Sequence, residues 1–235
     1  MGLAGALLLL VLAGCGADPA ERSYLAALRG EETGMTREQQ IALLDQAVSL
    51  APRRSWYYET RAIYEIDLRR FDAAFGDMDH VVALADRPYA RFLRGLIRCQ
   101  SGDYAGALPD FDAAISKQPA NTQFYRGRSL ARGMTGDAVG ALQDAEHLVK
   151  TAPQQGESFY ARGMALSRLG RTQEALADFD HALAIRPELV YAAEARADVY
   201  GRLDDPIQAE IARRTAEENR TQHDGCAACS DPFRY

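Results

Sequence analysis

The chain has 235 residues, of which 47% are hydrophobic and 26% are charged. It carries 27 Lys and Arg against 33 Asp and Glu, which gives a formal net charge of -6 and a pI near 5.3. Nucleic-acid binding needs clustered cations, so this acidic balance offers no support for a nucleic-acid partner. The share of apolar residues suits an array of amphipathic helices and does not require a second globular core.

Residues 1–14 form an expected export signal. The stretch from Met1 to Ala13 is apolar, with the run LLLLVL, and is shorter than the ~20 residues of a permanent membrane span. It ends in LAGC, which resembles the lipobox of bacterial lipoproteins. The resemblance implies cleavage before Cys15 and acylation of that cysteine with palmitate-type chains, which would anchor residues 15–20 and the rest of the chain to a membrane.

The residue after the lipidation site bears on the destination. Gly16 stands where an aspartate would favour the inner membrane, and the resemblance to Gram-negative lipoproteins therefore implies the outer membrane, facing the periplasm. The alternative is an ordinary secretory peptide that is cut after Ala17, which would leave a soluble periplasmic protein.

A period of about 34 residues runs through most of the remaining chain. The rows at this spacing are Gly95, Ser129, Gly163 and Ala197; Ala107, Ala141, Ala175 and Ala209; Gly102, Gly136 and Gly170; and Pro119, Pro153 and Pro187. Small residues mark the close approach of two helices, glycines mark turns with positive φ, and prolines mark the end of a second helix. The pattern predicts an array of helical hairpins.

These rows resemble the tetratricopeptide repeat, and RGMALSRLGRTQEALADFDHALAIRP, from Arg162 to Pro187, is the clearest copy. The resemblance implies an all-α, right-handed α-solenoid of about five to six hairpins. A degenerate hairpin is expected at 21–54 as an N-terminal cap. The repeats are placed at about 55–87, 88–121, 122–155, 156–189 and 190–222.

The C-terminal tail, residues 223–235, contains Cys226 and Cys229 in the sequence CAAC. In an exported protein this pair is expected to close a small disulfide. A redox centre would have the motif opening a helix after a strand, and no strand is expected here. A metal site that also used His223 would have three candidate ligands where a closed zinc site takes four.

Two rows of charge share the period. Arginines recur in the first helices and aspartates in the second helices, as Arg61 and Asp77, Arg94 and Asp110, Arg128 and Asp144, and Arg162 and Asp178. The helices of a hairpin are antiparallel, so each arginine is expected to pair with the aspartate sixteen residues later. These matched offsets favour structural ion pairs over a charged stripe that faces a ligand.

Neither catalytic residues nor a cofactor is expected. The sequence contains no nucleophile elbow, HExxH pair, phosphate-binding glycine loop or dinucleotide fingerprint. His80, His147 and His181 share one repeat position, but neighbouring repeats would hold them about 10 Å apart, too far for one metal. They are expected on an exposed polar face.

The family resemblance implies that the first helices line a concave binding groove. The corresponding positions here are Trp56, Glu59, Ile63, Tyr89, Phe92, Leu96, Arg126, Leu130, Met134, Tyr160, Met164 and Arg168. Aromatic, Met and Arg side chains are typical anchors of protein interfaces. The alternative is that some of them, such as Ile63 and Leu130, pack only between helices.

The expected function is that of a lipid-anchored, non-enzymatic adaptor that holds peptides or envelope proteins, as tetratricopeptide outer-membrane lipoproteins do. An alternative of another class is a redox or metal-dependent accessory protein that acts through the CAAC tail. Self-association through the terminal repeat, 190–222, would make the protein a homo-oligomer.

Overall fold

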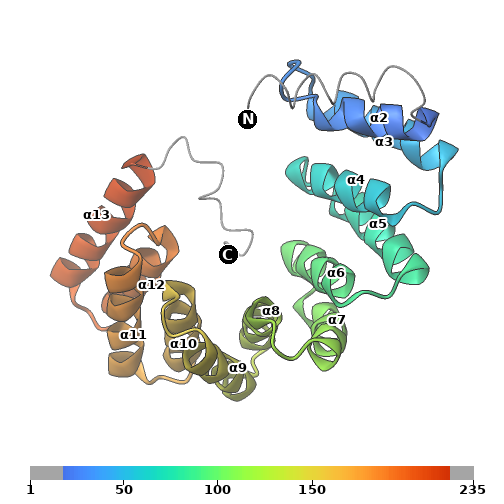
Figure 1. Ribbon diagram of the computed structural model, residues 1–235. Coiled ribbons are helices and arrows are strands. Elements are labelled where there is room, and N and C mark those ends of the chain that lie inside the picture. Colours follow the sequence, from blue (N-terminus) through green and yellow to red (C-terminus); the bar gives the residue numbers. More distant parts are fainter. Residues whose placement is uncertain (1–17, 223–235) are drawn as a thin grey trace. The chain divides into compact units, whose positions relative to one another are not determined.

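The structure is a computed structural model that describes residues 18–222 (Figure 1). The predicted signal peptide, the predicted lipidation site Cys15 and the predicted disulfide between Cys226 and Cys229 lie outside the described residues. The chain divides into two compact units, Met1–Ser101 and Gly102–Tyr235. The division falls inside the repeat predicted at 88–121.

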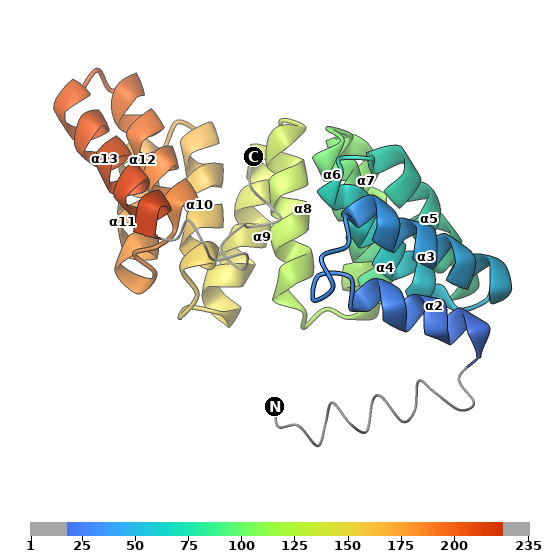
Figure 2. The ribbon, with the colours of Figure 1, turned by 90° about the horizontal axis from the view of Figure 1, so that it is seen from above.

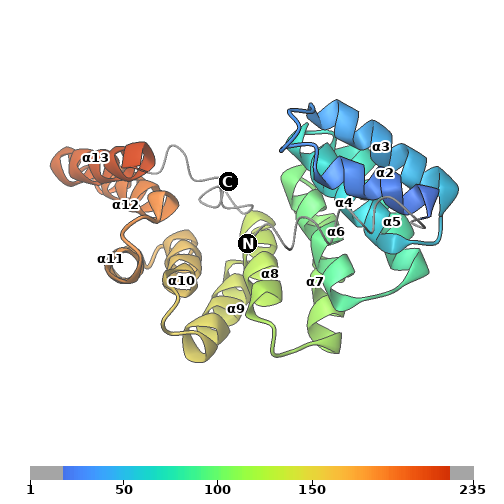
Figure 3. The ribbon, with the colours of Figure 1, turned by 45° about the horizontal axis from the view of Figure 1, so that its top comes forward.

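The first unit is a stack of antiparallel helices (Figure 3). Its helices are α2 (Pro19–Leu28), α3 (Arg37–Leu50), α4 (Ser55–Asp67), α5 (Phe71–Leu84) and α6 (Pro88–Gln100). Helices α2 and α3 form one hairpin and α4 and α5 the next, and each second helix also packs against the first helix that follows it. Tyr58, Met78 and Val81 form the centre of the core between α4 and α5.

The second unit repeats this arrangement (Figure 2). Its helices are α7 (Tyr104–Lys117), α8 (Thr122–Met134), α9 (Ala138–Thr151), α10 (Gly156–Arg168), α11 (Thr172–Ile185), α12 (Val190–Arg202) and α13 (Pro206–Gln222). Helices α8 and α9, α10 and α11, and α12 and α13 form hairpins, and α10 also contacts the first helices on either side, α8 and α12. The first helices therefore line one side of this unit.

The fold class is the one expected from the sequence, because the described residues form an all-α solenoid of hairpins without strands. The first helices α4, α6, α8, α10 and α12 begin at the residues where the repeats were placed. At the N-terminus, α2 starts at Pro19 after the N-cap Asp18, so regular structure begins inside the predicted linker 15–20. Within the described part of the chain, no helix has the length and apolar character needed to cross a membrane.

The recurring prolines end the second helices. Helices α7, α9 and α11 stop two residues before Pro119, Pro153 and Pro187. The intervening residue adopts an extended φ near -140°, as the steric restriction before proline favours.

The small-residue row marks where the two helices of a hairpin touch. Ser129 donates a hydrogen bond from Oγ to the carbonyl oxygen of Ala141 at 2.9 Å. One repeat later, a Cβ at Gly163 would lie 2.7 Å from Cε1 of Phe179 and 3.2 Å from the carbonyl oxygen of Ala175. The two helices approach so closely at this position that only a small side chain fits between them.

Arginines of the first helices join the two helices of their own hairpin. Arg61 donates from Nε to Oδ2 of Asp77 at 2.8 Å, Arg128 to Asp144 at 2.9 Å and Arg162 to Asp178 at 2.8 Å. Each pair is bidentate, with a second bond from Nη2 to Oδ1. The three aspartates are buried, which makes these pairs part of the hairpin interior. The fourth predicted pair, Arg94 with Asp110, would join residues of different units and stays a prediction.

Four arginines of the first helices also reach back to the preceding second helix, a contact that the sequence did not lead us to expect. Their Nη1 atoms donate to acids on the preceding second helix, with distances of 2.6 Å for Arg61–Asp45, 2.6 Å for Arg94–Asp79, 2.6 Å for Arg128–Asp112 and 2.7 Å for Arg196–Asp180. We call these arginines, together with their carboxylate partners in the same hairpin and on the preceding second helix, the arginine ladder. It raises the pKa of Arg61, chiefly through the hydrogen bond to Asp77, so the guanidinium stays charged despite its partial burial.

The turns between the helices of a hairpin require a left-handed residue. Gly102, Gly136 and Gly170 have φ of 87°, 90° and 74°. Arg69 and Asp204 occupy the equivalent positions and have φ of 57°. A side chain with a Cβ is strained in this region, and an arginine tolerates it less well than an aspartate.

We expect Arg69→Gly and Asp204→Gly to raise the free energy of unfolding by about 0.5–1 kcal/mol, because glycine relieves the strain at positive φ. The gain should be larger at Arg69. Urea denaturation followed by circular dichroism measures both changes. Gly136→Ala is the matched control and should lower stability by about 1 kcal/mol. A loss of stability in Arg69→Gly would contradict the assignment of strain to this turn.

We expect Asp144→Ala to lower the free energy of unfolding by about 3 kcal/mol, because it removes the buried carboxylate that the partly buried guanidinium groups of Arg128 and Arg132 share. Asp144 accepts hydrogen bonds from both arginines. Asp112→Ala removes the exposed carboxylate on the other side of Arg128 and should cost less than about 1 kcal/mol. Urea denaturation measures both variants. Equal losses of unfolding free energy would show that burial of the carboxylate does not determine how much each ion pair contributes to stability.

Candidate functional site

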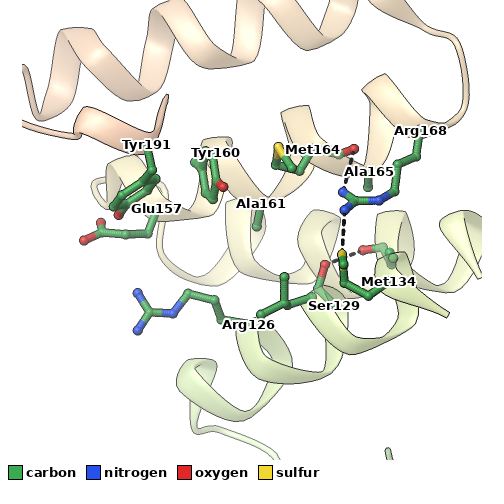
Figure 4. A pocket seen from close by; sticks show the side chains of 13 residues that line it. Arg126, Ser129, Met134, Glu157, Tyr160, Ala161, Met164, Ala165, Arg168 and Tyr191 are labelled. Carbon is green, nitrogen blue, oxygen red and sulfur yellow. Dashed lines mark hydrogen bonds between the residues drawn. The ribbon is translucent and has the colours of Figure 1, made fainter. Parts of the chain in front are cut away.

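A pocket opens between α8 and α10 in the second unit (Figure 4). Six of its lining residues are the groove positions predicted for this unit: Arg126, Leu130, Met134, Tyr160, Met164 and Arg168. The others are Ser129, Gly133, Ala141, Glu157, Ala161, Ala165 and Tyr191. The sequence period therefore brings all six predicted side chains of these two helices to one place.

The middle of the pocket is apolar and narrow. Leu130 and Met134, one helical turn apart on α8, and Met164 on α10 line it. Its volume is about 60 Å³. Small-molecule sites usually enclose roughly 300–1,000 Å³, so this pocket matches single side chains of a peptide better than a cofactor.

One wall of the pocket is aromatic. Tyr160 and Tyr191 meet edge to face, with ring centroids 4.5 Å apart. Tyr160 also packs 6.1 Å from Phe179, which belongs to the core between α10 and α11. Tyr160 is thus held by the core on one side and presents the rest of its ring to the pocket.

Charged side chains lie at both ends of the pocket. At one end Arg168 lies across α8, where its Nη2 donates to Sδ of Met134 at 3.1 Å and its Nη1 to the carbonyl oxygen of Met164 at 3.5 Å (Figure 4). At the other end Glu157 forms an ion pair with Arg186. Burial lowers the pKa of Arg186, but the hydrogen bond to Glu188 and the charge of Glu157 outweigh it, so the pKa is raised and Arg186 stays protonated.

The three histidines that share a repeat position pack against aromatic rings. The ring centroids are 4.3 Å apart for His80 and Tyr58, 4.1 Å for His147 and Tyr125, and 4.1 Å for His181 and Phe159. They are therefore packing residues of each hairpin as well as polar surface. Across residues 18–222, no group of three His, Cys, Asp or Glu side chains is arranged to hold a metal ion.

Comparison with known proteins agrees with this geometry. Residues 156–189, which include α10, α11 and three of the predicted groove positions, match the family model of the tetratricopeptide repeat. The chain contains a tetratricopeptide repeat. No curated protein shows significant sequence similarity to the chain.

Solved tetratricopeptide-repeat structures share the fold at low sequence identity. A tetratricopeptide-repeat protein from Parabacteroides merdae is 16% identical, with a TM-score of 0.74 over 85% of this chain and 78% of that chain. YrrB, a tetratricopeptide-repeat protein with an unusual peptide-binding site, is 17% identical, with a TM-score of 0.61 over 75% and 91%. MamA from Desulfovibrio magneticus RS-1 is 16% identical, with a TM-score of 0.51 over 88% and 98%. At these identities the likeness concerns the fold alone.

The groove positions predicted in the first unit have diverse environments. Trp56, Ile63 and Tyr89 are about half exposed, with 47%, 49% and 52% of their surface accessible. Glu59 forms an ion pair with Arg87, so its carboxylate is already occupied. Leu96 is half-buried.

The expectation that Phe92 is an exposed groove anchor is wrong. Its side chain is 3% exposed, and its ring lies 5.9 Å from that of Tyr89. The repeat position was assigned correctly, but a large ring at this point of α6 packs into the protein. In this aromatic pair the side chain of Tyr89 is exposed and that of Phe92 is buried.

The tetratricopeptide period could also have found pocket residues that the sequence analysis missed. Glu157 and Tyr191 lie 68 and 102 residues after Tyr89, which are multiples of the 34-residue period, yet only Trp56 and Tyr89 of this row were selected. Extending this row to the last two repeats would have predicted Glu157 and Tyr191 as lining residues, and with Tyr191 the aromatic wall of the pocket.

Proposed function

We propose that this protein is a non-enzymatic adaptor that binds a peptide or an extended segment of a partner protein in the pocket between α8 and α10. The observation that carries the proposal is the convergence of six groove positions on that pocket. Its apolar middle and its polar ends are the combination through which protein interfaces obtain affinity and orientation.

The proposal also covers where the adaptor works. The LAGC sequence supports a lipid anchor on Cys15, and the Gly16 that follows supports the outer membrane and its periplasmic face. A protein anchored in this way would hold its partner at the membrane surface and raise the partner's local concentration there.

We expect Met134→Gln to weaken peptide binding about tenfold, because Met134 is an accessible apolar residue of the pocket that a partner side chain would bury. The full chain is immobilised and exposed to a library of random synthetic octapeptides, and the retained peptides are identified and quantified by mass spectrometry.

Val139→Gln is the matched control for this experiment. Val139 is an exposed apolar residue on α9 in the same repeat, and it does not line the pocket. The control should retain the same peptides as the original protein. Equal peptide retention by Met134→Gln and by the original protein, or no retention by either, would overturn the pocket as a binding site.

We expect Cys15→Ser to abolish lipid labelling and to release the protein from the membrane fraction, because the serine cannot form the thioether to the lipid. Labelling with a palmitate analogue in a Gram-negative host, followed by fractionation and N-terminal mass analysis, measures both effects. Cys226→Ser is the control and should keep the label. A mature protein that begins at Asp18 and carries no lipid would contradict the anchor and identify an ordinary secretory signal.

A further inference from the structure

Arg168 is placed at the pocket without an acidic partner. Its guanidinium contacts a thioether sulfur and a carbonyl oxygen, which are weaker acceptors than a carboxylate. The side chain lies against Gly133, where a Cβ would be 3.4 Å from its Nε and 3.5 Å from its Cζ. The arginine therefore lies across α8 in close contact with the backbone at position 133.

Arg202 repeats this arrangement one repeat later. It stands 34 residues after Arg168, and its Nη2 donates to Oγ of Ser167 at 2.5 Å. Ser167 in turn stands 34 residues after Gly133. Each arginine therefore contacts a small residue of the preceding first helix. The one that Arg202 contacts, Ser167, is next to Arg168 in the chain.

These two arginines differ from most arginines of the second unit. Those of the ladder and of the loops have carboxylate partners, as in Arg128–Asp144, Arg171–Glu174 and Arg186–Glu157. Among residues 18–222, no carboxylate lies within ion-pair distance of Arg168 or Arg202. The nearby C-termini of α10 and α12 favour cations but offer only partial charges.

We propose that the partner segment carries a carboxylate beside an apolar residue, with the apolar side chain in the pocket between Leu130 and Met164 and the carboxylate on Arg168 and Arg202. This inference rests on the proposed function and names the partner's chemistry. A guanidinium matches a carboxylate in shape and charge, and binding would neutralise two cations that the protein itself leaves unneutralised. The carboxylate belongs either to an Asp or Glu side chain or to a peptide C-terminus.

The test uses the immobilised full chain and random octapeptide libraries made with free and with amidated C-termini, at low ionic strength. Peptides retained by the original protein should be enriched about tenfold in Asp or Glu next to an apolar residue, or in a free C-terminus. Arg168→Gln combined with Arg202→Gln should remove the enrichment. Raising the salt concentration should reduce it, because the arginines are exposed.

Arg214→Gln is the matched control, since Arg214 is an exposed arginine of α13 that has no ion pair among the described residues and does not line the pocket. It should keep the full enrichment. Enrichment in both libraries identifies a side-chain carboxylate, and enrichment only with free C-termini identifies the terminal one. Unchanged melting curves of the double variant establish that it is folded.

Two results overturn the inference and leave the proposed function standing. One is retention of peptides without acidic enrichment, and the other is the same enrichment in the double arginine variant. If the original protein retains no peptide above the level of Met134→Gln, the proposed function fails and this inference fails with it.

Discussion

The orientation of each hairpin on its neighbour depends on one recurring interaction, an arginine held between two carboxylates. Arg128 illustrates it, because its guanidinium binds the buried Asp144 of its own hairpin and the exposed Asp112 of the preceding one. One side chain thus joins three helices. Buried ion pairs add little net stability but are costly to break, so the ladder penalises arrangements in which a hairpin is rotated against its neighbour. Apolar contacts supply the driving force, and the ladder selects the orientation.

The ladder also shows how the last repeat differs from the others. Arg196 keeps its bond to Asp180 of the preceding hairpin, but the residue sixteen positions later is Ala212 instead of an aspartate. Within the described residues, Nε of Arg196 is buried without a hydrogen-bond partner. At this position the last hairpin therefore keeps the ion pair to the preceding helix and lacks the one to its own second helix. Terminal repeats commonly depart from the pattern in this way, because they have a neighbour on one side only.

The sequence predicted the features that follow from the 34-residue period. It did not predict how deeply a side chain is buried or which helices of neighbouring hairpins touch. Helix starts and proline stops follow from rows of equivalent residues, and so do the ion pairs within hairpins. The inter-hairpin half of the ladder was missed, although Asp112 and Asp180 were visible at a constant offset, because the helices of only one hairpin were considered. Phe92 was misjudged because the period assigns a position to a helix face but does not say how deeply a large ring sinks into it.

The histidines illustrate the same limit and a signal that went unused. His147 stacks on Tyr125, and the two positions change together in the repeat at 88–121, where Arg91 and Ala113 replace the ring and the histidine. A histidine therefore occurs where an aromatic partner is present. Joint replacement within one chain is what packing between the two positions requires, and it distinguishes a stacking residue from a free polar one.

The ladder and the pocket lie on different faces of α8. On α8, Arg128 stands two residues from both Arg126 and Leu130, which places the ladder away from the pocket side of the helix. The pocket side combines Ser129 and Gly133 with longer side chains, so a hollow remains where two first helices meet. The ladder orients the hairpins from the other face of the helix. Residues such as Met134 and Arg168 therefore take no part in the ion pairs that orient the hairpins. These pocket residues can therefore change without loss of the ion pairs that orient the hairpins.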